Sequence, residues 1–307
     1  MNAPSPYHVP VMGKEVVQWL VTDPNGLYAD FTVGGGGHSR LIWNQLSEAG
    51  RLVGIDRDPE AISEARGTLP DRNELLNIRF SEVQGKLETR FGSDFSGILL
   101  DLGVSSWQLD EARRGFTYRE DGPLDLRMCQ GSGETAAQLL DRINESELKE
   151  ILKSLGEDPQ AGRIARAIIR ARTSDEIRTT GQLAAIIRQS VPATAHKSLP
   201  RVFQALRMVV NQELEELGVG LSAAWHLLKP TGRLVVLTYH SLEDRPVKQF
   251  MQTLVHPPSP LLPQLTAPPP RPRGRYPVRG PLLPTPQEIA DNPRSRSAKL
   301  RVIEKLN

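Results

Sequence analysis

The 307-residue sequence contains a single cysteine, Cys129. One thiol excludes an internal disulfide and any metal site built only from cysteines, and the spacing of the other residues matches no zinc site. No apolar run approaches the roughly 18 residues of a membrane-spanning helix. The start, MNAPSPYHVPVM, has neither the basic nor the apolar segment of a secretory signal. These absences predict a cytoplasmic protein that binds no metal and no membrane.

Acidic residues are scarce in two stretches of the chain. Residues 158–207 hold nine Lys and Arg against three acids, and residues 271–301 hold eight against two. Each stretch is therefore +6, and because the formal net charge is only +2, the rest of the chain carries about −10. Such segregation of charge favours a polyanionic partner, although two solvated surfaces would give the same counts.

The first hundred residues alternate apolar strands with helices. The expected helices run from His38 to Glu48 and from Asp58 onward, where Pro59 suits a first helical turn. The expected strands are 28–33, 51–56, 77–80 and 97–102. Near-continuous apolar strands between helices are typical of a parallel sheet that is covered on both faces. The pattern predicts a doubly wound α/β fold.

A long helical segment then interrupts this pattern. The next strand of similar quality is 233–239, whereas a doubly wound fold joins neighbouring strands with perhaps 25–30 residues. We therefore expect an inserted helical domain at 111–211, within a sheet domain formed by 1–110 and 212–307. A proline-rich segment, 256–286, contains twelve prolines and is expected to be an irregular loop, before a last strand at 299–305.

Two helices are expected inside or beside the insertion. One carries an apolar face, and the other carries three isoleucines on one side and three arginines on another. The residues of the first face are Phe203, Leu206, Val210, Leu214 and Leu217; those of the second helix are Ile164, Ile168 and Ile169, with Arg163, Arg166 and Arg170. The arginines would meet phosphate, or would form a solvated face with internal ion pairs.

A glycine run at the end of the first strand indicates a nucleotide-like ligand. Gly34 to Gly37 follow Asp30 and open a helix, so the backbone can approach a ligand closely. Asp56 ends the second strand, where a carboxylate can bind both ribose hydroxyls. Ser39 occupies the place of the third glycine of a dinucleotide motif, and Asp30 suits a ligand with an amino group. Both features favour S-adenosylmethionine over NAD, although glycine-rich turns also serve close packing.

The residues near the expected site restrict the chemistry. Cys129 has no neighbouring His or Lys and does not suit the thiolate attack that methylation of cytosine C5 requires. Direct transfer to an O or N atom remains, for which positioning supplies most of the rate. Asp101 follows the fourth strand and could accept a hydrogen bond from a reacting amine, or cap a turn. His38 suits a backbone-fixing or ligand-contacting role better than that of a general base.

Several longer motifs resemble those of the bacterial 16S ribosomal RNA cytosine-N4 methyltransferase family. The matching segments extend in order over nearly the whole chain: His8 to Met12, Asp30 to Ser39, Gly54 to Pro59, Leu100 to Ser106, Gln108 to Asp110, Arg114 to Thr117, Gly122 to Met128, Phe203 to Arg207, His240 to Arg245 and Asn292 to Arg301. The resemblance implies a class I methyltransferase fold, Rossmann-like and doubly wound, with an inserted all-helical domain. The sheet domain would bind S-adenosyl-L-methionine, and the insert would recognise the substrate.

The resemblance also implies an activity and a site. The activity is N4 methylation of a cytosine in the decoding region of 16S ribosomal RNA, within the small subunit or a late precursor of it. The implied cofactor contacts are Gly36, Gly37, His38, Asp56, Asp101 and Gln108, and the residue pattern alone adds Asp30. Two departures stand out. Leu87 replaces a usual aromatic, so its cofactor contact would be apolar packing only, and Lys197 to Arg201 replaces the usual His-Pro-Ala-Thr-Arg.

Further candidates come from the motifs after the insert. Tyr239 and His240 would contact the target base, or Glu243 and Arg245 would brace the loop with an ion pair. Four basic residues lie beside the last strand and could bind phosphate or protect the strand edge: Arg294, Arg296, Lys299 and Arg301. In a strand, Lys299 and Arg301 share a face.

Two other functions fit parts of the pattern. A dinucleotide oxidoreductase would use the same fold, although Ser39 and the distribution of charge count against it. A non-catalytic RNA-binding assembly factor would retain the cofactor fold without the transfer, and only an activity measurement separates it from the methyltransferase.

Overall fold

The structure is a computed structural model that describes residues 10–257 and 271–307. The chain divides into two compact units. Met1–Gly103 and Glu215–Asn307 form the first, called here the sheet unit, and Val104–Leu214 form the second, the helical unit. The segment expected at 111–211 thus begins at Val104 and ends at Leu214.

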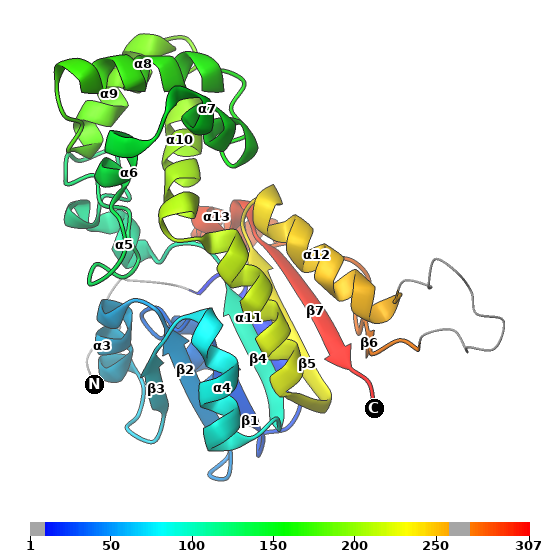
Figure 1. Cartoon of the computed structure of the whole chain (residues 1–307). Helices are drawn as coiled ribbons and strands as arrows, with labels where there is room; N and C mark the ends of the chain where they lie inside the picture. Colours follow the sequence, from blue (N-terminus) through cyan, green and yellow to red (C-terminus); the bar gives the residue numbers. More distant parts are fainter. Residues whose placement is uncertain (1–9, 258–270) are drawn as a thin grey trace. The chain divides into compact units, whose positions relative to one another are not determined.

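A seven-stranded sheet forms the centre of the sheet unit (Figure 1). Its strands are β1 (Leu27–Asp30), β2 (Arg51–Asp56), β3 (Glu74–Asn77), β4 (Phe95–Asp101), β5 (Leu228–Thr238), β6 (Gly274–Arg275) and β7 (Lys299–Lys305). The order is β3-β2-β1-β4-β5-β7-β6, in which β1 to β5 pair in parallel and β7 runs antiparallel to both neighbours. The chain leaves β1 toward β2 on one side and returns at β4 on the other, so the order reverses between β1 and β4. Doubly wound sheets bind ligands at the carboxyl ends of their strands at such a point.

Helices cover both faces of this sheet because side chains along each strand alternate between the faces. The helices of the sheet unit are α1 (Gly13–Leu20), α2 (Gly37–Trp43), α3 (Pro59–Thr68), α4 (Phe80–Phe91), α11 (Glu213–Leu227), α12 (Ser241–Val255) and α13 (Pro286–Asp291), with a 3-10 turn η2 (Pro293–Ser297). Ile98 and Leu100 of β4 share a buried cluster with α4, α11 and α12, which lie over one face in Figure 1. Leu99, between them, belongs to the cluster formed with α1 and α2. The expected doubly wound fold is confirmed, although its sheet is mixed.

Two local expectations in the sheet unit are wrong. The strand expected at 77–80 lies at Glu74–Asn77, and α4 begins at Phe80 instead. The Glu82 carboxylate accepts the backbone N–H of Arg79 at 3.1 Å, which caps the helix directly after the strand. The loop expected over 256–286 contains β6 and an isolated bridge at Leu282. Residues 258–270 of that loop lie outside the described part of the chain.

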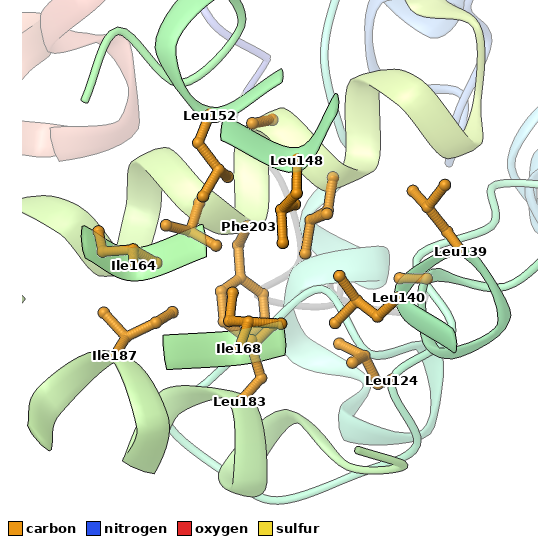
Figure 2. Close-up of a cluster of buried hydrophobic side chains, with 14 of the residues drawn as sticks. Leu124, Leu139, Leu140, Leu148, Leu152, Ile164, Ile168, Leu183, Ile187 and Phe203 are labelled. Carbon is orange, nitrogen blue, oxygen red and sulfur yellow. The ribbon is translucent and has the colours of Figure 1, made fainter. Parts of the chain in front are cut away.

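The helical unit encloses a hydrophobic core of its own (Figure 2). Its helices are α5 (Ser106–Asp110), α6 (Ala136–Arg142), α7 (Glu145–Ser154), α8 (Ala161–Ser174), α9 (Thr180–Ser190) and α10 (Ala195–Val210), with a 3-10 turn η1 (Ala112–Arg114). Figure 2 shows Leu148 and Leu152 of α7, Ile164 and Ile168 of α8, and Phe203 of α10 gathered in this core. The burial of Ile164 and Ile168 agrees with the apolar side expected for α8.

The apolar face expected to continue from Phe203 to Leu217 is split between two helices. α10 ends at Val210, and Gln212 has a φ of 52°, which breaks the helical path before α11. The buried Asn211 side chain holds this break: its amide donates to the carbonyl oxygens of Leu126 at 2.7 Å and of Arg207 at 2.9 Å. Periodicity alone does not reveal such a break, because the apolar spacing continues through it.

Neither unit offers a membrane span or a metal cluster within the described residues. No helix among residues 10–257 and 271–307 is long and apolar enough to cross a membrane. The same residues contain no group of three or more His, Cys, Asp or Glu arranged to hold a metal ion.

Candidate cofactor and methyl-transfer site

Three carboxylates end neighbouring strands at the point where the strand order reverses. Asp30 ends β1, Asp56 ends β2 and Asp101 ends β4. The loop after β1 connects all three. Thr32 contacts the carboxylate of Asp30 and accepts the backbone N–H of Asp101 at 2.6 Å, while Gly34 donates to Asp56 at 3.0 Å. The sheet unit therefore brings these predicted site residues together.

Asp56 is half-buried and faces the glycine loop. One carboxylate oxygen accepts the N–H of Gly34 at 3.0 Å, and the other accepts the N–H of Asp58 at 2.9 Å. Burial raises the pKa of Asp56 to about 6, although these two backbone donors oppose the shift. Each oxygen retains a further acceptor position, so the group can still bind hydroxyl donors.

The glycine loop has the conformation that a closely bound ligand needs. Gly34 and Gly36 have φ values of 50° and 83°, in the left-handed region that side chains rarely adopt. A Cβ at Gly37 would lie 3.0 Å from Pro10. The loop therefore requires glycine, and it presents bare backbone next to Asp56. This arrangement fits an adenosine-containing cofactor.

Asp30 supports the loop rather than facing a ligand. It is completely buried, and its oxygens accept from the Thr32 N–H at 3.1 Å and the Ser39 hydroxyl at 2.7 Å. Burial raises the pKa of this carboxyl, and the Ser39 hydrogen bond opposes the shift. The expected contact of Asp30 with the amino group of a ligand is therefore corrected, because none of its surface is accessible.

Asp101 is held between two side chains. One oxygen accepts the Tyr239 hydroxyl at 2.7 Å, and the other lies 3.3 Å from Nδ1 of His38. The side chain is 24% exposed, so substrate could still reach it. Burial, followed by the charge of Asp101, raises the pKa of Tyr239 well above its ordinary value of 10.0. Tyr239 is therefore a hydrogen-bond donor at neutral pH and not a base.

His38 lies between two hydrogen-bond acceptors. Its Nε2 lies 2.9 Å from the carbonyl oxygen of Val11, and its Nδ1 faces the Asp101 carboxylate. The carbonyl oxygen and the carboxylate can each accept a hydrogen bond from the ring. Burial alone would lower the pKa of His38, but the hydrogen bond to Asp101 and the charges of Asp101 and Asp30 outweigh it and raise the pKa. His38 thus orients Asp101.

His240 and Glu243 lie beside this group, at the start of α12. The Glu243 carboxylate accepts the backbone N–H of Tyr239 at 3.1 Å, and its other oxygen lies 2.8 Å from Nε2 of His240. That second contact is an ion pair without the alignment of a hydrogen bond. Glu243 therefore braces the backbone of Tyr239 and lies next to His240.

One expected cofactor contact, Leu87, is buried, and the aromatic residue Phe80 is partly accessible instead. Leu87 is completely buried within the core under α4, so it is not accessible to a cofactor and its expected contact is corrected. Phe80 is instead partly accessible, begins α4 and packs against Phe31 with ring centroids 6.2 Å apart. Phe80 comes two residues after Ile78, whose backbone N–H donates to the backbone carbonyl oxygen of Asp56 at 3.0 Å. Because residues 77–80 were expected to form a strand, Phe80 was not identified as a site residue.

The remaining predicted residues before β5 belong to the helical unit. Gln108 is buried at α5, where its side chain accepts the Ser105 N–H at 3.1 Å as part of a helix cap. Arg163, Arg166 and Arg170 are all exposed on α8, as expected, and Arg166 lies 3.3 Å from Glu145.

The basic residues beside β7 divide into two pairs. Lys299 and Arg301 share a face, as expected, but both bind the same carboxylate: Asp244 lies 3.2 Å from Lys299 and 2.6 Å from Arg301. Arg301 is only 14% exposed, so its expected role in phosphate binding is corrected to an internal ion pair. Arg294 and Arg296 are exposed on η2.

Comparison with known proteins identifies the family. A profile of the MraW methylase family matches residues 5–306. A ribosomal RNA small subunit methyltransferase H of Nitrosomonas europaea is 45% identical and covers 97% of each chain. One of Aromatoleum aromaticum is 45% identical and covers 98% of this chain and 97% of its own. Among solved structures, an rRNA methylase from Streptococcus thermophilus aligns with 96% of this chain and 94% of its own, at 12% identity and a TM-score of 0.40.

These matches confirm the resemblance carried by the sequence motifs, and they exclude the dinucleotide oxidoreductase. The doubly wound sheet, the glycine loop and the carboxylates of Asp56 and Asp101 agree with a class I methyltransferase. The chain belongs to the MraW methylase family.

Proposed function

We propose that the protein transfers a methyl group from S-adenosyl-L-methionine to the exocyclic N4 amine of a cytosine in the decoding region of 16S ribosomal RNA. The observation that carries this proposal is the Asp101 carboxylate, which is fixed on both oxygens and still partly accessible at the carboxyl end of β4. Relatives 45% identical to the chain are named as methyltransferases of small-subunit ribosomal RNA.

The cofactor would lie over the carboxyl ends of β1 and β2. S-adenosyl-L-methionine supplies a methyl group on a positively charged sulfur. Asp56 would accept the ribose hydroxyls, and the glycine loop would contact the cofactor through its backbone. Phe80 would give the apolar contact that sequence reasoning had assigned to Leu87.

Cofactor affinity should depend on pH through Asp56. Its carboxyl has a pKa of about 6, so about nine-tenths of it is ionised at pH 7. If only the carboxylate accepts the ribose hydroxyls, affinity falls as pH drops through 6, and Kd at pH 5 should be about tenfold higher than at pH 7. Calorimetry with S-adenosylhomocysteine at both pH values measures this ratio. Asp56→Asn, which cannot titrate, is the control, and a wild-type Kd that does not change would contradict the assignment.

Asp101 would accept a hydrogen bond from the reacting amine. The His38 ring and the Tyr239 hydroxyl orient the carboxylate, and the raised pKa of Tyr239 keeps its hydroxyl a donor at neutral pH. Asp101 is therefore the accessible acceptor among these three groups. An amine N–H that donates to it has its lone pair directed toward the methyl group, so positioning rather than strong base catalysis lowers the barrier.

The chemistry of a C5 methyltransferase does not suit this site. That reaction needs a cysteine thiolate beside the base, and the single thiol, Cys129, has no neighbouring His or Lys in the sequence to activate it. The Asp101 acceptor suits an exocyclic amine, which must be oriented and later lose a proton.

The helical unit would recognise the substrate through the arginines of α8. Each phosphate contact that is lost flattens the slope of log affinity against log salt by about 0.7–0.9. Replacing Arg163, Arg166 and Arg170 with glutamine should therefore weaken RNA binding and reduce the slope by about 2. Both side chains of the Arg166–Glu145 ion pair are exposed, so a phosphate should readily replace Glu145 as the partner of Arg166.

A matched control removes three positive charges elsewhere. Arg51, Lys86 and Arg90 are exposed at the amino-end side of the sheet, away from the proposed site. Their glutamine triple variant should leave the slope unchanged. An unaltered slope in a folded α8 variant would mean that these arginines form only a solvated face.

Methyl transfer itself tests the proposed function. Labelled methyl from S-adenosylmethionine should enter 16S ribosomal RNA when unmodified small subunits, or late precursors of them, are the substrate. Transfer to subunits at different stages of assembly would identify the stage that the enzyme acts on. No transfer at any stage, by a protein that binds S-adenosylhomocysteine, would favour an assembly factor without this activity.

A further inference from the structure

A second basic surface follows the free edge of the sheet. β6 pairs with the end of β7, and the chain then runs beside β7 until Leu282 pairs with Leu300. We call residues 271–283 the edge strip; β6, its first part, is visible beside β7 in Figure 1.

The edge strip is anchored at both ends by backbone hydrogen bonds. The Arg273 N–H donates to Leu254 at 2.8 Å, and its carbonyl accepts from Leu306 at 2.9 Å. At the other end, Leu282 exchanges two bonds with Leu300, at 2.9 and 3.0 Å. Three prolines within the strip restrict its φ angles and remove N–H donors. The strip is therefore a preformed surface that another strand cannot easily join.

The edge strip is positively charged and has no acidic residue of its own. Arg271, Arg273, Arg275 and Arg279 are all exposed, and residues 271–287 contain no Asp or Glu. Only Arg275 has a carboxylate partner among the described residues: Glu304, at 2.8 Å, which it shares with Arg233. Residues 1–9 and 258–270 contain no acidic side chain either.

An exposed aromatic lies among these arginines. Three large hydrophobic side chains are exposed in the described part of the chain, and two of them, Tyr276 at 40% and Leu283 at 63%, belong to the edge strip. A line of arginines with an exposed aromatic is the pattern by which proteins bind single-stranded nucleic acid, because phosphates meet the cations and a base stacks on the ring.

We propose that the edge strip binds a single-stranded segment of the RNA substrate, with Arg271, Arg273 and Arg279 contacting phosphates and Tyr276 stacking on a base. The inference rests on the proposed function for the identity of the substrate. Protection of a sheet edge would also use arginine and proline, but that role gives no reason for an exposed aromatic ring and predicts no binding of RNA.

The arginines are tested through salt dependence. The probe is a fluorescein-labelled oligocytidylate RNA of about 12 nucleotides, and anisotropy gives its Kd for the full-length protein between about 50 and 200 mM salt. The triple variant Arg271→Gln, Arg273→Gln, Arg279→Gln should lower the slope of log affinity against log salt by about 2, at about 0.7 per contact with a single strand. The Arg51, Lys86 and Arg90 control should keep the wild-type slope.

Tyrosine is tested through affinity at constant salt. Tyr276→Ala should raise the Kd for the same RNA about 5- to 150-fold, with an unchanged salt slope, since stacking releases no counterions. Tyr276→Phe keeps the ring and should bind like the wild type. Equal loss in both variants would indicate that the hydroxyl matters rather than stacking, and would overturn that part of the proposal.

The remaining outcomes separate this inference from the proposed function. S-adenosylhomocysteine binding should be unchanged in every edge-strip variant, which verifies folding. If the arginine variant keeps the wild-type slope while the wild type methylates small subunits, the edge-strip proposal is wrong and the function stands. If the variant loses binding to vesicles of anionic lipid but not to RNA, the strip serves a membrane surface and the proposal is equally overturned. Absence of methyl transfer by the wild type contradicts the function alone.

Discussion

Replacing Asp101 with asparagine is expected to lower kcat for methyl transfer by about 100-fold. The carboxylate accepts from the Tyr239 hydroxyl at 2.7 Å and lies 3.3 Å from Nδ1 of His38. An asparagine retains one acceptor and turns a donor NH2 toward either the His38 ring or the incoming amine. Loss of one hydrogen bond to a charged group costs about 1.5–3 kcal/mol, which corresponds to about 10- to 150-fold in rate.

RNA affinity should change far less, because the phosphate contacts proposed here come from other residues. Single-turnover transfer and anisotropy, measured on the same preparation, separate the two quantities. Cys129→Ser is the control and should retain nearly full activity, since no covalent adduct is needed. A folded Asp101→Asn enzyme with wild-type kcat would remove Asp101 from the reaction, and an inactive Cys129→Ser enzyme would restore the thiolate mechanism.

Replacing Asp56 with alanine is expected to raise the Kd for S-adenosylmethionine about 10- to 100-fold. The half-buried carboxylate would lose its hydrogen bonds to the ribose hydroxyls, which are worth on the order of 1.4–3 kcal/mol. The loop would also lose the bond from the Gly34 N–H at 3.0 Å, so its conformation before binding would be less defined.

Calorimetry at pH 7 measures this Kd. Asp71→Ala removes an exposed carboxylate from the same unit and should leave the Kd unchanged. Thermal unfolding of both variants without ligand identifies any loss of stability. A folded Asp56→Ala protein that binds as tightly as the wild type would show that the cofactor lies elsewhere.

The central strands could be predicted from the sequence because their apolar runs end in clear signals. β2 ends at Asp56 and β7 spans Lys299–Lys305, both as expected. The predicted position of β3 was wrong because the segment NIRF resembles a short strand in composition. In the structure, Arg79 and Glu82 instead form the cap of α4. Local composition alone does not decide between a strand and a capped helix at these residues.

The candidate site was predicted in outline and not in its internal contacts. Asp56 and Asp101 follow from their places at strand ends. The burial of Asp30 behind Ser39 and the contact of Tyr239 with Asp101, 138 residues away, depend on side-chain packing that no spacing reveals. Thr32, which precedes the glycine run and connects two of the carboxylates, was not predicted as a site residue.

Charge counts were informative about regions and misleading about single residues. Lys299 and Arg301 were correctly assigned to one face, but the sequence could not show that Asp244, on α12, lies between them. Their partner comes from a helix more than fifty residues earlier, and a count of local charge treats both residues as free. In the edge strip, Arg275 alone has a carboxylate partner among the described residues, Glu304 of β7.

The most direct test of the account is the identity of the methylated nucleoside. Unmodified small subunits are incubated with the enzyme and S-adenosylmethionine, and the 16S ribosomal RNA is digested and analysed by chromatography with mass spectrometry against N4-methylcytidine and C5-methylcytidine standards. The account predicts one N4-methylated cytidine, mapped to the decoding region, which is strongly diminished with Asp101→Asn and retained with Cys129→Ser. Methylation at cytosine C5, or on a ribose oxygen, would contradict it.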